Sequence, residues 1–439
     1  MRIFLKFELK LLLRNPFIGI LTILIFALLL FATQNGIKRV EKQQQTIKKL
    51  KDGENLFYQK SKLLLDSLEK GTKKPFSDRN WYLSPDNAIT LSAFRGAGSY
   101  VILPPAPLSV VSTGQSDIFP YYSKVALGTK NEAKDNENFE NPFNTAIGDF
   151  DLAFVLVFIF PLFIISLTYN VLSSEKEQGT LNLLLSMPLN IRSWLVQKIA
   201  FRYVFLMLLM SILLMTSLLV FGINMAESAF LSLLIATSLY TLFWFLCAFS
   251  VNLLGKSSSN NATILLGIWL FFTLMIPSVA NMLAGGLYPV PSRVAFVTAQ
   301  RDLKAQADKD KEKVLAAFYA KNPQFENKKD EDEKSWKDYW REGFAEEDYL
   351  KEMMAKLEHK FQGQAQAQRD FAGVFQWLSP AILFQNKLNQ LAKTDTQSYL
   401  DFDVKVAGFE ANWTNYFKNK FMKDEKMTTK DFDNFPRYK

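Results

Sequence analysis

Very few residues of this chain belong to the types that carry out catalysis or bind metals. Its 439 residues include one cysteine, Cys247, and one histidine, His359. One cysteine cannot form a disulfide within the chain, and one cysteine with one histidine is too few for a zinc, haem or iron–sulfur centre. His359 lies in the charged helical pattern of residues 356–361, which is typical of a solvated helix face. We therefore expect no catalytic residue, no metal site and no cofactor in this chain.

A short glycine-lysine-serine segment has part of the appearance of a phosphate-binding loop. In Leu254-Gly-Lys-Ser-Ser258 the first glycine of that motif is replaced by Ser250, and an apolar segment precedes the motif where a strand is required. We interpret residues 254–258 as a turn between two membrane spans. An ATP site is not expected here.

The most informative polar segment is 172–188, with the sequence LSSEKEQGTLNLLLSMP. Ser174 and Glu177 have the spacing of a capping box, which predicts that a helix begins there. Leu181, Leu184 and Leu185 would then share an apolar face, and Asn190 is predicted to cap the following helix. A short helix with acidic residues first and an apolar face after them is suited to docking against another protein. The alternative is a solvated turn between two spans.

A second group of polar residues lies inside an apolar segment. Thr237, Tyr240 and Thr241 recur at helical spacing. They are candidates for a substrate path or a helix interface. Hydrogen bonding between helices is the simpler interpretation, since small hydroxyl residues commonly provide it in membranes.

The polar residues described above lie in or between long apolar runs, which must hold them in place. Residues 17–33, 152–172 and 203–223 contain no charged residue or histidine, and about 20 apolar residues suffice to cross a bilayer as a helix. This excludes a soluble globular enzyme as a description of the whole chain, and the expected fold is an all-α polytopic membrane protein. Five spans are predicted, at 17–34, 150–172, 200–223, 229–254 and 262–287. Pro161 and Pro277 fall inside two of them, which is tolerated where neighbouring helices bond the freed carbonyls.

The distribution of basic residues predicts the orientation of the chain in the membrane. Residues 1–16 form an amphipathic pattern, with Lys6, Lys10 and Arg14 on the face expected to meet membrane lipid headgroups. The positive-inside rule places the N-terminus and the connections 173–199 and 255–261 in the cytoplasm. Residues 35–148 and 288–439 then lie outside.

The two outer regions differ in pattern. Residues 36–70 are predicted to continue the first span as a helix, and 75–125 to mix short strands with loops. Residues 293–372 are predicted to form a helical hairpin broken near residues 322–323, with a linker or disordered tail as the alternative. Hence we expect a mixed α/β first outer region and a helical second one.

Two further function classes are disfavoured. The 51 basic and 43 acidic residues give a net charge of +8 but are dispersed, so we expect no nucleic-acid binding. The spans contain almost no ionisable group, which disfavours secondary transport.

The segment 174–188, followed by Trp194-Leu-Val-Gln-Lys-Ile-Ala-Phe-Arg202, resembles the cytoplasmic signature of ABC-2 type transporter permeases. It is most similar to the subgroup with large extracytoplasmic insertions, akin to the NosY-like and gliding-motility permeases. The stretches that support the resemblance are 112–120, 150–155, 289–293, 378–381 and 391–395.

This resemblance implies an ABC-2 permease bundle in a bacterial cytoplasmic membrane. Such a permease subunit dimerises with a second copy or a paralogue. It exports a substrate using cytoplasmic ABC ATPase subunits, which hold the ATP and Mg. Carried over to this chain, the coupling residues that contact the ATPase are Glu175, Glu177, Gly179, Thr180 and Leu181. Such permeases usually have six spans, so we expect a sixth helix after residue 439, the alternative being a five-span protein.

A rival function from another class is a membrane-anchored scaffold or sensor. In that case the outer regions bind a ligand or a periplasmic partner, and the spans only hold them in place. A scaffold has no need of a cytoplasmic docking helix or of an ATPase, and these two features distinguish the hypotheses.

Overall fold

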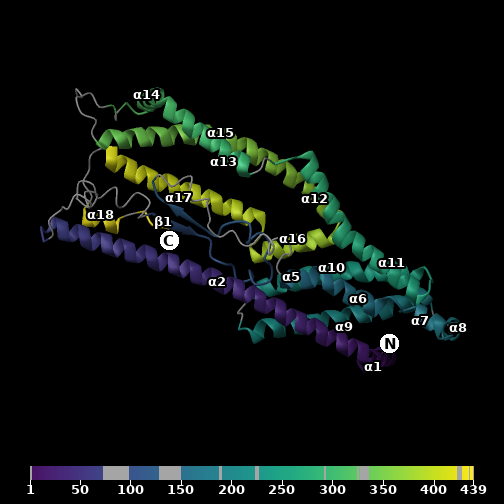
Figure 1. Cartoon of the computed structure of the whole chain (residues 1–439). Helices are drawn as coiled ribbons and strands as arrows, with labels where there is room; N and C mark the ends of the chain where they lie inside the picture. The colour runs from purple at the N-terminus through teal and green to yellow at the C-terminus, as the bar shows by residue number, and fades with distance from the viewer. Residues whose placement is uncertain are drawn as a thin grey trace.

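The structure is a computed structural model in which one very long helix runs along one side of the molecule (Figure 1). This helix is α2 (Pro16–Glu69), and its 54 residues correspond to a length of about 80 Å at 1.5 Å per residue. It begins at Pro16, as expected for a proline in a first helical turn. The residues that the structure describes are 2–72, 98–127, 150–186, 190–222, 227–290, 293–323, 326, 336–422, 428–434 and 436–438.

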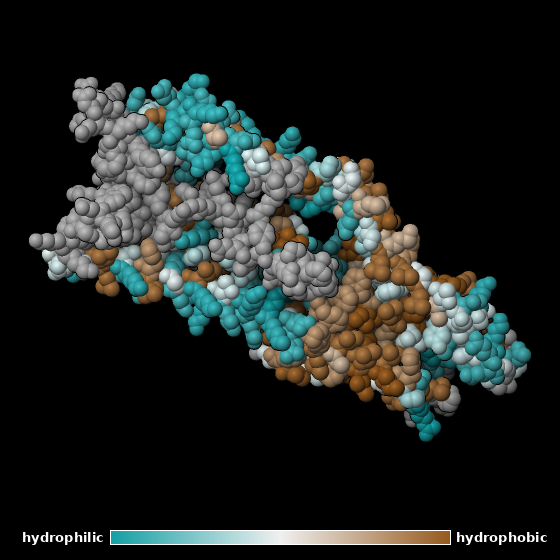
Figure 2. Space-filling model, in the orientation of Figure 1, coloured by the Kyte–Doolittle hydropathy of each residue, from teal (hydrophilic) through white to brown (hydrophobic). Residues whose placement is uncertain are grey.

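Five helical segments are long and apolar enough to cross a membrane. They are Pro16–Ser67, Leu152–Glu177, Ile191–Val220, Ser228–Leu253 and Ser258–Leu287. Apolar side chains gather over this part of the molecule in Figure 2. The chain is a helical, multi-pass membrane protein. Five spans were predicted, and the continuous helix from the first span through residue 69 is also confirmed.

Two of the spans contain a π-helical segment. The second span consists of α5 (Leu152–Phe154), η2 (Val155–Ile159) and α6 (Phe160–Thr168). The fifth consists of α11 (Ser258–Leu270), η3 (Phe271–Met275) and α12 (Ile276–Leu287). In each, a proline follows two residues after the π-helix. A proline cannot donate to the preceding turn and its ring crowds that turn, so a widened turn before it relieves the conflict.

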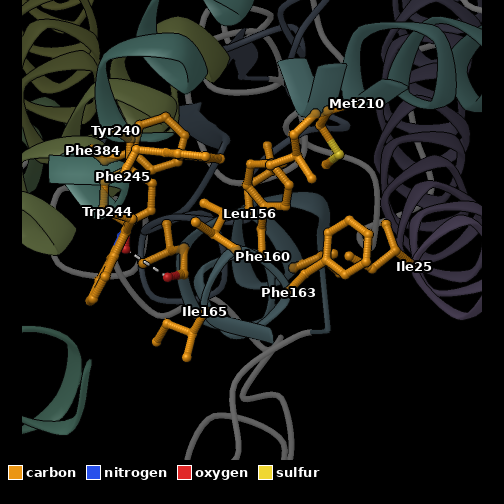
Figure 3. Packing of buried hydrophobic residues seen from close by; sticks show 14 of the residues in the cluster. Ile25, Leu156, Phe160, Phe163, Ile165, Met210, Tyr240, Trp244, Phe245 and Phe384 are labelled. Carbon is orange, nitrogen blue, oxygen red and sulfur yellow. Dashed lines mark hydrogen bonds between the residues drawn. The ribbon is translucent and has the colours of Figure 1, made fainter. Parts of the chain in front are cut away.

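The second span is the centre of the bundle. Leu156, Phe160 and Ile164 are fully buried there, and Figure 3 shows Leu156 and Phe160 among side chains of the surrounding helices. The third and fourth spans are α9 (Ile191–Val220) and α10 (Glu227–Leu253); α10 packs against the second span, and α9 packs against α2 and α10. Helix α9 begins at Ile191, directly after the predicted cap Asn190, and so extends before the apolar run at 200–223 that was predicted as the third span. Its first turns hold polar contacts outside the apolar run.

A second hydrophobic cluster fills the part of the molecule beyond the bundle. Its largest buried side chains are Phe402, Trp413 and Phe417, and α2 contributes Tyr58 and Leu65. The elements around it are β1 (Ser99–Ile102), β2 (Tyr122–Val125), α13 (Arg293–Lys309), α14 (Lys311–Lys321), α15 (Trp336–Val374), α17 (Thr396–Met422) and α18 (Thr429–Asp433). The two strands pair antiparallel.

The predicted helical hairpin is present. Helices α13 and α14 lie against α15, and α14 ends at Lys321 with Asn322 as its C-cap, so the predicted break near residues 322–323 is confirmed. A second break at Asp310, between α13 and α14, was not predicted.

Helix α16 (Pro380–Ala392) returns to the bundle after α15 and the short 3₁₀ helix η5 (Phe375–Trp377). Its Ala381, Phe384 and Leu388 belong to the same hydrophobic cluster as the spans. Residues 288–439 were all predicted to lie in an outer region, so the return of α16 to the bundle differs from the prediction.

Candidate functional site

The predicted coupling segment lies at the end of the bundle that also carries α1 (Arg2–Arg14) (Figure 1). It forms two short helices, α7 (Ser173–Glu177) and α8 (Leu181–Ser186). Gly179 lies in the turn between them with φ of +74°, a conformation that glycine adopts without the cost a side chain would add.

The predicted capping box is wrong. Helix α7 begins at Ser173 with Leu172 as its N-cap, and no side chain caps it. The carboxylate of Glu177 does not turn back to its own helix, because it bonds to another span. Asn190 does cap α9 as predicted, accepting a hydrogen bond from the Arg192 amide at 3.0 Å.

Glu175 ties the segment to α9. One carboxylate oxygen lies 3.0 Å from the Lys198 ammonium and the other accepts a hydrogen bond from the Thr180 hydroxyl at 2.5 Å. The Lys198 side chain is only 6% exposed, and its ammonium also lies 4.6 Å from the centre of the Trp194 ring. Glu175 and Thr180 therefore belong to one internal network.

Glu177 ties the segment to α11. Its carboxylate accepts hydrogen bonds from the Ser258 amide and the Ser258 hydroxyl, both at 2.8 Å. A carboxylate is favourable at this place because the first amides of a helix lack partners and carry partial positive charge. Lys176 adds a bond from its ammonium to the Gly255 carbonyl at 3.2 Å. Residues 254–258 thus form a turn that receives α7, in agreement with the interpretation as a turn between spans.

The exposed edge of the segment is uncharged apart from the bonded Lys176 and Glu177. Gln178, Gly179 and Asn182 are exposed, and Leu181 is half-buried. Charge pairing of the two glutamates with an ATPase remains a prediction. In this structure their carboxylates hold the segment in place, and the uncharged residues are presented outward.

A second ion pair lies one turn further along α9. The Arg202 guanidinium is 2.9 Å from the Glu8 carboxylate of α1 and also donates to the Leu167 carbonyl. The Glu8 side chain is 2% exposed and that of Arg202 is 14% exposed. Sequence reasoning missed this pair. The available signal was a lone acid among the basic residues of α1, with Lys198 and Arg202 four residues apart on α9.

Tyr240 of α10 contacts both the second span and α16 (Figure 3). Its hydroxyl donates to the Val157 carbonyl at 2.8 Å, and Val157 lies in the π-helix η2, four residues before Pro161, which has no amide hydrogen to donate to that carbonyl. The ring stacks on Phe384 of α16 with centroids 4.4 Å apart. The Thr237 and Thr241 hydroxyls donate to carbonyls of their own helix. All three residues are buried within the chain. A substrate path along them remains a prediction.

Side chains of other elements bond two more carbonyls of the π-helices. The Trp269 indole donates to the Phe158 carbonyl at 3.1 Å, and the Ser379 hydroxyl donates to the Phe272 carbonyl at 2.6 Å. The expectation that neighbouring elements would satisfy carbonyls near Pro161 and Pro277 is confirmed.

We expect Tyr240→Phe to lower the free energy of unfolding by about 1–3 kcal/mol, since the Val157 carbonyl would stay buried without a donor. Unfolding monitored by circular dichroism in mild detergent measures the effect. The matched control is Thr237→Val, because the Leu233 carbonyl keeps its helical amide partner. The free energy of unfolding should therefore fall less in this variant than in Tyr240→Phe. Equal losses in the two variants would contradict the role given to Tyr240.

At the opposite end of the bundle, α2 and the second span hold the loop between β1 and β2. Arg39 of α2 donates to the carbonyls of Ser109 and Ser112 and, at 3.0 Å, to the Ser116 hydroxyl. The Asp151 carboxylate accepts from the amides of Thr113 and Phe154, each at 2.7 Å. A half-buried cation, Arg39, and a buried anion, Asp151, therefore fix the backbone of this loop.

Helix α16 and the residues after it also bond to the loop between β1 and β2. The Ser112 hydroxyl bonds the Asn389 side chain at 2.6 Å, and the Gln115 amide donates to the Thr394 carbonyl at 2.8 Å. The approach is so close that a Cβ on Gly114 would lie 2.5 Å from that carbonyl oxygen. Burial raises the pKa of nearby Tyr399 to about 12, so its phenol stays neutral. Three stretches that carry the family resemblance, 112–120, 150–155 and 391–395, meet here.

Comparison with known proteins gives one match. A family described as "Domain of unknown function (DUF3526)" matches residues 293–439. No curated protein and no solved structure matches the chain. The family description names no activity. Among the residues that the structure describes, no group of three or more His, Cys, Asp or Glu side chains could hold a metal ion.

Proposed function

We propose that this chain is the permease subunit of an ATP-driven exporter of the ABC-2 type. A separate cytoplasmic ATPase, which carries ATP and Mg, docks on α7 and α8, and its cycle drives outward movement of a substrate through the spans. The proposed location is a bacterial cytoplasmic membrane with the N-terminus in the cytoplasm. The observation that supports this function best is the construction of the α7–α8 segment.

A docking element can transmit a displacement only if it is attached firmly to the spans that must move. Glu175 and Glu177 attach α7 to α9 and α11. The Asn252 side chain adds a link, since it accepts from the Leu172 amide at 3.1 Å and donates to the Thr168 carbonyl at 2.9 Å. A push on α7 would therefore act on the second, third, fourth and fifth spans together.

The rest of the assembly follows from the family resemblance. Two permease subunits and two ATPase subunits are expected, the second permease being a copy of this chain or a paralogue. The fifth span is the least buried of the five within this chain, which leaves most of its surface for lipid or for that second permease.

The test is purification from the native membrane in mild detergent, with identification of the proteins that accompany the chain. We expect an ATPase subunit to accompany it. The Gln178→Arg, Asn182→Arg double variant should lower the yield of that subunit about tenfold or more, because two cationic side chains would occupy the uncharged contact.

Glu175→Ala and Glu177→Ala should act differently. They loosen the attachment of α7, so we expect the ATPase to remain bound while the permease loses its effect on the rate of ATP hydrolysis. Glu352→Ala is the control, because Glu352 pairs with a lysine, Lys321 at 2.6 Å, as Glu175 does, and is exposed, as Glu177 is, but lies in the outer region. An unaltered effect on hydrolysis in both glutamate variants would remove these residues from the coupling site.

The second hydrophobic cluster favours the alternative function, a membrane-anchored scaffold or sensor. It gives the region beyond the bundle a core of its own around Trp413 and Phe417, as a ligand-binding scaffold or sensor requires. If that function is correct, the chain purifies without an ATPase and is accompanied only by proteins that bind its outer regions.

A further inference from the structure

The second and fifth spans differ in construction from the third and fourth. The third and fourth are uninterrupted α-helices of 30 and 27 residues, whereas η2 interrupts the second span and η3 interrupts the fifth. π-Helical turns within α-helices are rare. Two of them in one bundle therefore need a common explanation.

Both π-helices lie at the same level of the fourth span. Tyr240 of α10 bonds the Val157 carbonyl of η2. Phe243, one turn later on α10, packs against Phe272 of η3 with ring centroids 5.3 Å apart. The two interruptions are therefore neighbours in the bundle, although they are more than 100 residues apart in the sequence.

Side chains bond the carbonyls at both interruptions. The Trp269 indole, two residues before η3, donates to the Phe158 carbonyl of η2 at 3.1 Å and so joins the two π-helices directly. The carbonyls of Val157 and Phe272 accept from hydroxyls of other elements. Bending a regular α-helix lengthens its amide-to-carbonyl bonds on one side. At η2 and η3 the bend can change while these carbonyls keep their side-chain donors.

The parts of the two spans on the α7 side of the π-helices are tied to each other. The buried Asn261 side chain of α11 donates to the Tyr169 carbonyl after α6 at 3.1 Å. The hydroxyls of Ser173 and Ser258 lie 2.8 Å apart, and Glu177 bonds the same Ser258. Helices α6, α7 and α11 are therefore expected to move as one body.

On the other side of the π-helices, each span is attached to an outer region. The Ala153 amide at the start of the second span bonds the Val111 carbonyl at 2.9 Å, and Asp151 holds the same loop. Tyr288, directly after α12, packs against Phe371 of α15 with ring centroids 5.5 Å apart. These ends therefore follow the outer regions and not the coupling segment.

We propose that η2 and η3 are a pair of hinges at which the second and fifth spans change their bend together. A displacement of α7 relative to the outer regions must be taken up between the two sets of attachments, and each span has its one interruption there. The Trp269 indole keeps the two changes in step. The hinges are a property of the spans themselves, and only the force that drives them rests on the proposed export function.

The test measures distances between pairs of spin labels by double electron–electron resonance, in phosphatidylcholine–phosphatidylglycerol nanodiscs and a Cys247→Ala background. One pair, Leu231→Cys with Leu287→Cys, joins the outer ends of the fourth and fifth spans. The control pair is Leu246→Cys with Asn260→Cys, because both residues lie on the α7 side of the π-helices. All four residues are exposed.

The expected result is two distances for the outer pair and one for the control pair. Leu287 lies about 20 Å beyond the middle of η3, so a change in bend of about 20° displaces it by about 7 Å. Pro277→Ala restores an amide and lets η3 close into a regular α-helix, so the outer pair should then give one distance. Pro16→Ala, at the start of α2 where no π-helix precedes the proline, should leave both distances.

A double-mutant cycle tests the link through Trp269. Pro161→Ala alters η2 only, yet it should change the ratio of the two outer-pair distances at least threefold. In the presence of Trp269→Phe, which lacks the donor, the same substitution should leave that ratio unchanged.

Three outcomes would contradict the proposal. A single outer-pair distance in the wild-type protein would show that the fifth span does not bend. Two distances that persist in Pro277→Ala would place the motion elsewhere than η3. An equal effect of Pro161→Ala with and without Trp269→Phe would remove the link between the hinges. A chain that shows both distances but purifies without an ATPase would keep the hinges and lose the export function.

Discussion

Replacing Arg202 by alanine is expected to destabilise the protein by about 3–5 kcal/mol, because the buried Glu8 carboxylate would lose its only described cationic partner. The pair joins α1 to α9 at 2.9 Å, and Glu8 is 2% exposed. The same guanidinium bonds the Leu167 carbonyl at the end of the second span. We therefore expect α1 to detach from the bundle in this variant.

Unfolding in mild detergent, followed by circular dichroism, measures the loss. The informative comparison is the double variant Glu8→Gln, Arg202→Met, which removes both charges and keeps similar volumes. It should recover most of the lost stability, since the cost of the single variant is mainly that of an unpaired buried charge. A double variant as unstable as Arg202→Ala would show that packing of the arginine, and not the charge, holds α1.

Replacing Asp151 by alanine is expected to have an effect of similar size, about 3 kcal/mol or more. The buried Thr113 amide and the part-buried Phe154 amide would lose their acceptor, and an unsatisfied buried group costs about 1–3 kcal/mol. Loss of the N-cap of the second span is included in this sum. Asp151→Asn should be milder, because the amide oxygen can still accept one of the two bonds.

The Asp151 variant should also release a particular loop. We expect the Thr113 amide to exchange with solvent deuterium at least tenfold faster in Asp151→Ala, while amides of α17 keep their rates. Asp433→Ala is a suitable control, because Asp433 forms an exposed ion pair with Lys62 at the far end of α2. Exposed pairs contribute little, so this variant should change neither quantity. Unaltered exchange at Thr113 in Asp151→Ala would contradict the role of the carboxylate.

The helices and their order could be predicted because their signals are local. An apolar run of about 20 residues needs no knowledge of its neighbours to form a span. Proline at the start of α2 and the break near residues 322–323 are likewise read from adjacent residues. The start of α9 was likewise read from its cap, Asn190, whereas hydropathy reports only the apolar part of that helix.

The contacts of the candidate site could not be predicted from neighbouring residues in the sequence. Glu175 and Glu177 stand out in the sequence by their spacing, but their partners Lys198 and Ser258 are 23 and 81 residues away. The capping-box prediction for Glu177 was wrong for this reason, since a helix N-terminus from another span offers its carboxylate two donors. Gly179 is different. Its conformation serves a local turn, and its residue type already indicated this.

From the sequence alone, one can establish a helical multi-pass membrane protein, its five spans and the position of its polar segments. Only the tertiary structure shows that Glu8 meets Arg202, that Tyr240 bonds a carbonyl of the π-helix before Pro161, and that α16 returns to the bundle. The physical reason is that hydrophobic partition acts on each segment separately, whereas ion pairs and hydrogen bonds depend on which segments lie side by side. Helix α16 also carries too many polar residues to be recognised by hydropathy, and its contacts with α10 reveal its place.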